Sequence, residues 1–118
     1  MVKWYSGGRT KECRLMILLH IIAKDEKQAE AISDFLLMKK FVLDTFTVAG
    51  KMNEPDEDNK TSARSRILVI AKTRALLFDK IDKALQRKYP KEPPILYSLP
   101  IVNMDWDHAS ELEENIKV

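Results

Sequence analysis

The sequence predicts an α+β fold with the element order β-α-β-β-α-β-α. Two observations support this prediction. Four apolar segments rich in β-branched and aromatic residues alternate with two segments whose apolar residues recur at helical spacing, and a third, short helical segment ends the chain. The length of 118 residues, of which 45% are hydrophobic and 32% charged, is typical of one globular domain with a single core.

The first half of the chain contains a strand, a helix and a second strand. Residues 14–23, RLMILLHIIA, are a nearly continuous apolar run, which is typical of a central strand. Residues 26–39 have apolar side chains at helical spacing, and Asp25 with Gln28 three residues later resembles a capping box. Residues 41–49, FVLDTFTVA, are rich in β-branched and aromatic residues and predict the second strand.

The second half contains two more strands and a second helix. Residues 66–72, RILVIAK, are expected to pair antiparallel with the second strand, because the two strands are consecutive. Thr73 is a suitable N-cap for a helix over 74–88, and Pro90 prevents that helix from continuing. Residues 95–101 then form the fourth strand.

Three further segments complete the domain organisation. Residues 1–13 are interpreted as an N-terminal arm ahead of a single domain over 14–118. Residues 50–64 are polar and contain a proline, which predicts a flexible loop or a frayed hairpin tip between the second and third strands. The chain ends in a short helix, whose N-cap is either Asp105 or Asp107.

This order of elements defines a ferredoxin-like sandwich, in which two helices cover one face of an antiparallel four-stranded sheet. The first strand is apolar on both of its faces, because Leu19 and Ile21 alternate with Leu18 and Ile22. The third strand has the same pattern. Two helices cover only one face of the sheet, so we expect a second copy of the chain to cover the other.

Composition excludes several classes of function. The net charge of +2 is too small to indicate a nucleic-acid or anionic-membrane surface, and no apolar stretch reaches the roughly 18 residues of a membrane span. The single cysteine, Cys13, excludes an internal disulfide and a multi-cysteine metal cage. Together with an N-terminus that lacks the pattern of a signal peptide, this cysteine use predicts a cytoplasmic protein.

Residues 88–101 read KYPKEPPILYSLPI, in which Pro94 is followed by a Leu-Pro-Ile end. This segment resembles the connection from a helix to the last long strand in the CutA family, which is associated with tolerance of divalent cations. Residues 70–73, IAKT, resemble the end of the family's third strand, and residues 23–41 are similar to its first helix. The resemblance extends over residues 14–116.

The resemblance implies a PII-like ferredoxin fold that assembles as a homotrimer, with the three sheets packed around the axis. It also implies a non-enzymatic function in divalent metal tolerance, with copper or another divalent cation as ligand, or in small-ligand signalling. The family's proposed metal ligands are a cysteine and histidines. The matching positions here hold Ile21, Lys88 and Tyr89, so the usual ligands are not retained.

One cluster near the C-terminus has metal-ligating groups of its own. Asp105, Asp107 and His108 supply two carboxylates and an imidazole within four residues, which could meet a divalent ion at the start of a helix. The alternative interpretation is a helix N-cap with acidic residues at the positive end of the helix dipole.

A group of basic residues suggests the alternative function, a PII-like nucleotide-binding or anion-binding regulatory protein. These residues could line an anion pocket between subunits, although the glycine-rich phosphate loop of such proteins is missing. They are Lys60, Arg64, Arg66, Lys72 and Arg74.

Two more residues are assigned to packing, and none to catalysis. His20 lies inside the first strand and is expected in the core or at a subunit interface, and Trp106 is expected to pack or fill an interface. No nucleophile–base set, P-loop or dinucleotide-binding turn is suggested by spacing, so we expect no enzyme activity.

Overall fold

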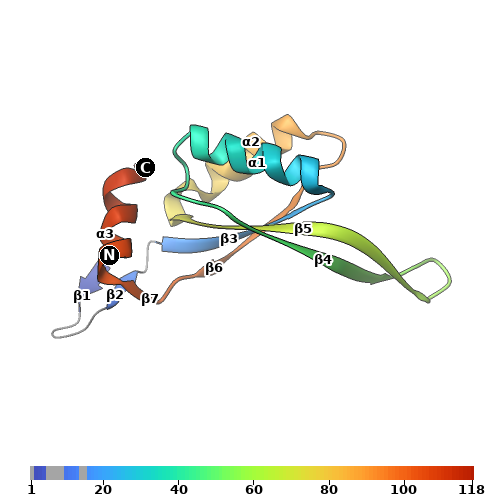
Figure 1. Cartoon of the computed structure of the whole chain (residues 1–118), viewed down its shortest axis with the longest axis horizontal. Coiled ribbons are helices and arrows are strands. Elements are labelled where there is room, and N and C mark those ends of the chain that lie inside the picture. Colours follow the sequence, from blue (N-terminus) through green and yellow to red (C-terminus); the bar gives the residue numbers. More distant parts are fainter. Residues whose placement is uncertain (1, 5–9, 14–15) are drawn as a thin grey trace.

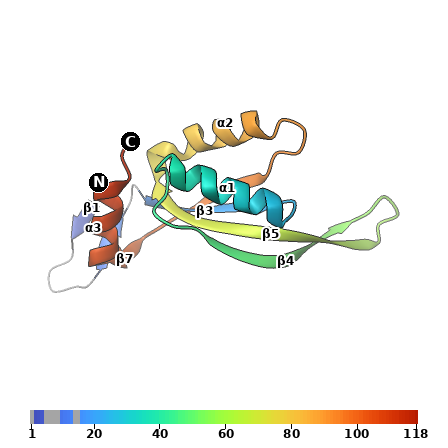
Figure 2. The same ribbon diagram turned by 45° about the horizontal axis from the view of Figure 1, so that its top comes forward.

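The computed structural model describes residues 2–4, 10–13 and 16–118. Its centre is a four-stranded antiparallel sheet in the order β4-β5-β3-β6. The strands are β3 (Met16–Ala23), β4 (Phe46–Pro55), β5 (Thr61–Arg74) and β6 (Ile95–Pro100). Helices α1 (Glu26–Met38) and α2 (Phe78–Lys88) lie side by side on one face of this sheet (Figure 1 and Figure 2). The predicted ferredoxin-like fold is confirmed.

The core lies between the two helices and the sheet. From the sheet, alternate residues of β3 and β5 point toward the helices and are fully or almost fully buried. Apolar residues at helical spacing on α1 and α2 pack against these strand residues. The main buried side chains are Ile17, Leu19, Ile21, Val69, Ala71, Ala29, Ile32, Leu36, Ile81 and Leu85. Burial of each large aliphatic side chain stabilises the fold by about 1.5–3 kcal/mol.

The start of α1 is fixed by a side-chain cap. The carboxylate of Asp25 accepts a hydrogen bond of 2.8 Å from the backbone N–H group of Gln28. The Gln28 side chain accepts a bond from the backbone N–H group of Lys24 at 2.8 Å, and donates one to the carbonyl of Glu92 at 3.2 Å. The cap therefore also joins α1 to the proline-rich segment before β6.

The β4–β5 pair is a long regular hairpin, where the polar composition of residues 50–64 predicts a flexible loop or a frayed hairpin tip. Strand β4 continues to Pro55 and β5 begins at Thr61, with Met52 opposite Arg64 in the ladder. The turn is closed by the Asp56 carboxylate, which accepts from two backbone N–H groups at 2.9 Å. Side chains on both faces of this arm are mostly exposed, so it lacks the alternation of apolar and polar residues that reveals a strand.

Two other boundaries differ from the expectation. The second strand begins at Phe46 rather than at 41, because Phe41 packs in the loop against Phe35, with ring centroids 6.2 Å apart. Thr73 does not cap α2. It is buried in β5, where its hydroxyl donates a bond of 2.6 Å to the Phe41 carbonyl, and a 3₁₀ turn over Ala75–Leu77 leads into the helix.

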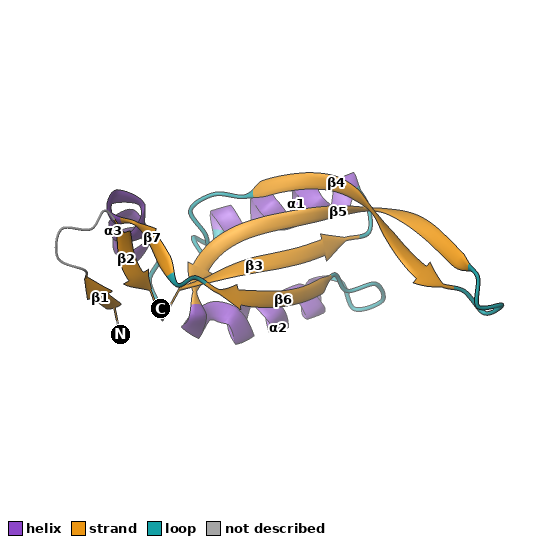
Figure 3. Cartoon of the chain, turned by 90° about the horizontal axis from the view of Figure 1, so that it is seen from below, coloured by secondary structure: helices purple, strands orange, loops and turns teal. Residues whose placement is uncertain are grey.

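A smaller unit lies at one end of the molecule. Strands β1 (Val2–Trp4), β2 (Thr10–Cys13) and β7 (Asn103–Asp105) form a second antiparallel sheet next to helix α3 (Trp106–Asn115) (Figure 3). The N-terminal arm therefore contributes two strands to a sheet. No helix within the described residues is long and apolar enough to cross a membrane.

Candidate functional site

In the described part of the chain, nothing covers the second face of the four-stranded sheet. Figure 3 looks onto this face, and both α1 and α2 lie behind the strands. Cross-strand pairing places apolar residues in rows across it, such as Val48, Leu68, Ile22 and Ile95. On this uncovered face, Phe46 is 67% exposed and Tyr97 44% exposed. An apolar surface that crosses all four strands is typical of an interface or a ligand-binding site.

His20 lies at the centre of the uncovered face. It stands between Ile70 of β5 and Tyr97 of β6 in the ladder. Its Nδ1 atom is 3.1 Å from the Tyr97 hydroxyl oxygen, and the two rings meet edge to face with centroids 5.2 Å apart. His20 and Tyr97 therefore form a polar pair within an otherwise apolar surface. That His20 belongs to a subunit interface stays a prediction.

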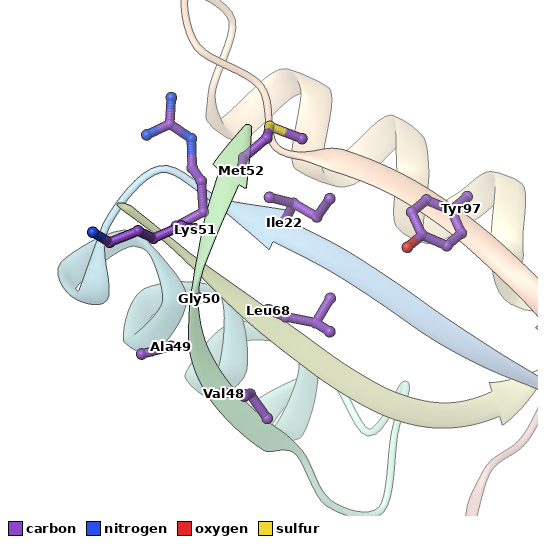
Figure 4. Close-up of a pocket in the computed structure, with 9 residues that line it drawn as sticks. Ile22, Val48, Ala49, Gly50, Lys51, Met52, Leu68 and Tyr97 are labelled. Atoms are coloured by element: carbon purple, nitrogen blue, oxygen red, sulfur yellow. The ribbon is translucent and has the colours of Figure 1, made fainter. Parts of the chain in front are cut away.

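A hollow of about 320 Å³ opens on the uncovered face at the base of the hairpin. Figure 4 shows Ile22, Leu68 and Tyr97 of three neighbouring strands around it, with Met52 of the fourth at its upper edge. Gly50 of β4 lies opposite Arg66, and a Cβ atom added at Gly50 would meet nothing within 4 Å. The glycine leaves room for another molecule to approach the backbone closely.

A more polar cleft of about 380 Å³ adjoins this hollow and shares Ile22, Met52 and Arg66 with it. Its wall includes Pro93 and Pro94, which are held in place by the contact of Gln28 with the carbonyl of Glu92. The cleft also contains cations and carboxylates, of which Lys24 and Glu92 form an ion pair of 3.4 Å. The two cavities together offer an apolar floor with charged groups at one end, which suits an amphipathic small ligand. The charged groups are Lys24, Glu54, Arg64, Arg66 and Glu92.

The candidate metal ligands at the start of α3 do not converge into a site. Asp105 is the N-cap, and its carboxylate accepts a bond of 2.9 Å from the backbone N–H group of His108. Asp107 is exposed in the first turn, and Nε2 of His108 is buried without a hydrogen-bond partner among the described residues. Among all the residues that the structure describes, no group of three or more His, Cys, Asp or Glu side chains could hold a metal ion. Trp106, the first residue of α3, is 39% exposed.

The predicted anion-binding residues are also separated. Lys60 lies beyond the end of the hairpin strands, and Lys72 is about 20 Å along β5 from Arg66, at the usual rise per residue. Lys72 forms an ion pair of 3.4 Å with Asp44, and Arg74 donates a bond of 3.3 Å to the carbonyl of Ile116. Arg64 and Arg66 of this group line the same cavity.

The positions that match the family's metal ligands have other environments. Ile21 is fully buried in the core. The Lys88 ammonium lies 5.3 Å from the centroid of the Phe35 ring. The Tyr89 hydroxyl is buried without a partner among the described residues, and this burial raises the pKa of Tyr89, while the charge of Lys24 acts in the opposite direction.

Sequence reasoning missed Gly50, Met52, Lys24 and Glu92 as site residues. Gly50 and Met52 fall in the segment expected to be a flexible loop or a frayed hairpin tip, so their place on the sheet was not predicted. The available signal was the proline-rich stretch from 90 to 94, whose stiffness indicates that its neighbours have fixed positions.

Comparison of sequences alone finds no match, either to a protein-family model or to a curated protein. Solved structures do match. CutA from Synechococcus elongatus PCC7942 superimposes with a TM-score of 0.82 at 13% identity, covering 92% of this chain and 96% of that one. That protein has also been solved with a Bis-Tris molecule.

Two further structures give the same result. The periplasmic divalent cation tolerance protein CutA of Archaeoglobus fulgidus matches with a TM-score of 0.78 at 21% identity, over 87% of this chain and 100% of that one. The divalent cation tolerance protein of Thermus thermophilus has a TM-score of 0.77 at 18% identity, with coverage of 87% and 100%. The chain therefore has the fold of the CutA divalent cation tolerance proteins over most of its length, at low sequence identity.

Proposed function

We propose that this protein is a non-enzymatic CutA-like homotrimer that acts in divalent cation tolerance, including copper, or in small-ligand signalling. The observation that carries the proposal is the uncovered apolar face of the sheet. A face that exposes Phe46, Val48, Ile95, Tyr97 and Leu99 is costly to leave in water, and burying each of these side chains would contribute about 1.5–3 kcal/mol.

Assembly through this face would also complete the candidate site. The hollow near Gly50 opens on the uncovered face, and the cleft near Arg66 adjoins this hollow. Three copies packed by their sheets would turn these open hollows into clefts between subunits. Ligand pockets are preferentially found at such junctions.

The proposal is tested by the molar mass of the protein in solution, measured by light scattering during size-exclusion chromatography. One chain has a mass of 13.7 kDa, so three times this value, about 41 kDa, is expected for the trimer. A mass of one chain at micromolar concentration would exclude the trimer and the clefts between its subunits.

The polar cleft favours a second candidate function, binding of a small anionic ligand as in PII-like regulators. Arg64, Arg66 and Lys24 line it from β5 and from the segment before α1. A thermal-shift screen of small carboxylates and nucleotides tests this candidate, with Arg66→Gln as the variant. A rise in the melting temperature of the wild type that disappears in Arg66→Gln would support this candidate. A rise that persists in the variant would exclude the cleft as the binding site.

A further inference from the structure

A second groove, between α1 and α2, has a different character from the uncovered face. It has a volume of about 640 Å³. Its lining consists of four cationic and three apolar residues. They are Lys39, Lys80, Arg87 and Lys88, with Phe35, Phe41 and Ala84. None of these lining residues is acidic, and none of the four cations forms an ion pair with a carboxylate of the described residues.

Two of the cations are held by aromatic rings. The Lys80 ammonium lies 5.8 Å from the centroid of Phe41, and the Lys88 ammonium lies 5.3 Å from that of Phe35. The two rings in turn contact each other edge to face. The lysines are therefore partly ordered before any ligand arrives, which lowers the entropic cost of binding.

The spacing of the cations follows from the helix. Arg87 and the adjacent Lys88 lie about two turns beyond Lys80 on α2, and Lys80 and Lys88 are separated by about 12 Å along the axis. Lys39, just after α1, approaches from the opposite wall. A linear ligand with several negative charges could meet all four cations at once.

We propose that this groove binds a polyphosphate, either inorganic or carried by a nucleoside. Arg and Lys side chains are the usual partners of phosphate oxygens. The seven lining residues are far fewer than the roughly 20–30 residues on each side of a protein–protein interface, so a small ligand fits better than a folded partner. The volume lies within the range of about 300–1,000 Å³ for small-molecule sites.

The groove is independent of the proposed assembly. The helices lie on one face of the sheet and the apolar surface lies on the other (Figure 1 and Figure 3). Packing of sheets against one another would leave the helical layer open to solvent, so the groove should bind its ligand in a monomer and in a trimer alike.

Isothermal titration calorimetry at low ionic strength tests the proposal, with sodium tripolyphosphate, ATP and octaglutamate as probes. We expect one polyphosphate site per chain, with affinity that falls when salt screens the charges. The double variant Arg87→Gln, Lys88→Gln should weaken binding at least about tenfold, because each lost contact is a charge-assisted hydrogen bond. The matched control Lys27→Gln, Lys91→Gln removes the same charge from exposed positions outside the groove and should change binding less than about twofold.

The outcomes separate the possibilities. Loss of binding in the groove variant supports the proposal, and a requirement for ATP rather than tripolyphosphate would identify the nucleoside form. No binding to the wild type, or equal weakening in both double variants, would overturn it. Tighter binding of octaglutamate than of tripolyphosphate would overturn it in favour of an acidic polypeptide. Circular dichroism verifies that each variant is folded.

Discussion

The two faces of the central sheet are built from the same strands, yet they differ in what covers them. Along β3, Leu19 and Ile21 are completely buried under the helices, whereas Leu18 and Ile22 on the other face are only partly buried. All four are large aliphatic residues. The difference shows that an apolar composition on both faces of a strand does not mean that one chain buries both faces, because the helices here cover only one of them.

The largest expected effect contrasts one residue from each face. Leu19→Ala should lower the free energy of unfolding by about 2–5 kcal/mol, because it leaves a cavity in a closed core. Leu68→Ala on the uncovered face should cost less than about 1 kcal/mol when measured in a Phe46→Lys background, in which the face is kept open. Urea denaturation followed by circular dichroism measures both. Equal costs at the two positions would contradict the distinction between the faces.

A second prediction concerns Tyr89, on the helical side of the sheet. Burial raises the pKa of its hydroxyl, so the unfolded chain loses this proton at a lower pH than the folded chain. The contribution to stability is fully present below the unfolded pKa and is lost as the pH rises through the folded pKa. Tyr89→Phe should therefore be close to neutral at pH 7, within about 1 kcal/mol, and should lose less stability than the wild type in alkaline solution.

Melting temperatures of the two proteins between neutral and strongly alkaline pH test this prediction. Parallel losses for Tyr89→Phe and the wild type would show that other groups account for the alkaline destabilisation.

The smallest effect is expected for the cluster at the start of α3. The double variant Asp107→Asn, His108→Gln removes two candidate metal ligands. It keeps the Asp105 cap, because the Asp105 carboxylate accepts its hydrogen bond from the backbone N–H group of residue 108 and not from a side chain. Titration with Cu²⁺ and Zn²⁺ should give affinities within about twofold of the wild type, since these groups do not converge. A tenfold loss of affinity for either metal would show that Asp107 or His108 binds it, as the sequence pattern suggests.

Much of the fold could be predicted because each long element has its own periodic signal. The strand at β3, the helix that begins after Asp25 and the helix capped by Asp105 are examples. Thr73 was misassigned because a β-branched residue with a hydroxyl suits both a strand and a cap. Its role depends on the Phe41 carbonyl, which lies 32 residues earlier in the chain and accepts its hydrogen bond.

The site was harder to predict, since its parts meet only through tertiary structure. The hairpin arm that contains Gly50 and Met52 is held by backbone pairing, which leaves little trace in side-chain pattern. The basic groove combines Lys39 with Arg87, and their proximity depends on how two helices dock on a sheet. In the sequence, such basic residues look like the ordinary cations at the C-terminal end of a helix.

The most direct test of self-assembly through the uncovered face compares two substitutions of equally exposed residues. Phe46 lies on that face and Leu76 lies in the 3₁₀ turn before α2, and each is 67% exposed. Light scattering should give about 41 kDa, three times the 13.7 kDa of one chain, for the wild type and for Leu76→Lys, and 13.7 kDa for a folded Phe46→Lys. An unchanged trimer in Phe46→Lys, or a wild type with the mass of one chain, would contradict assembly through this face.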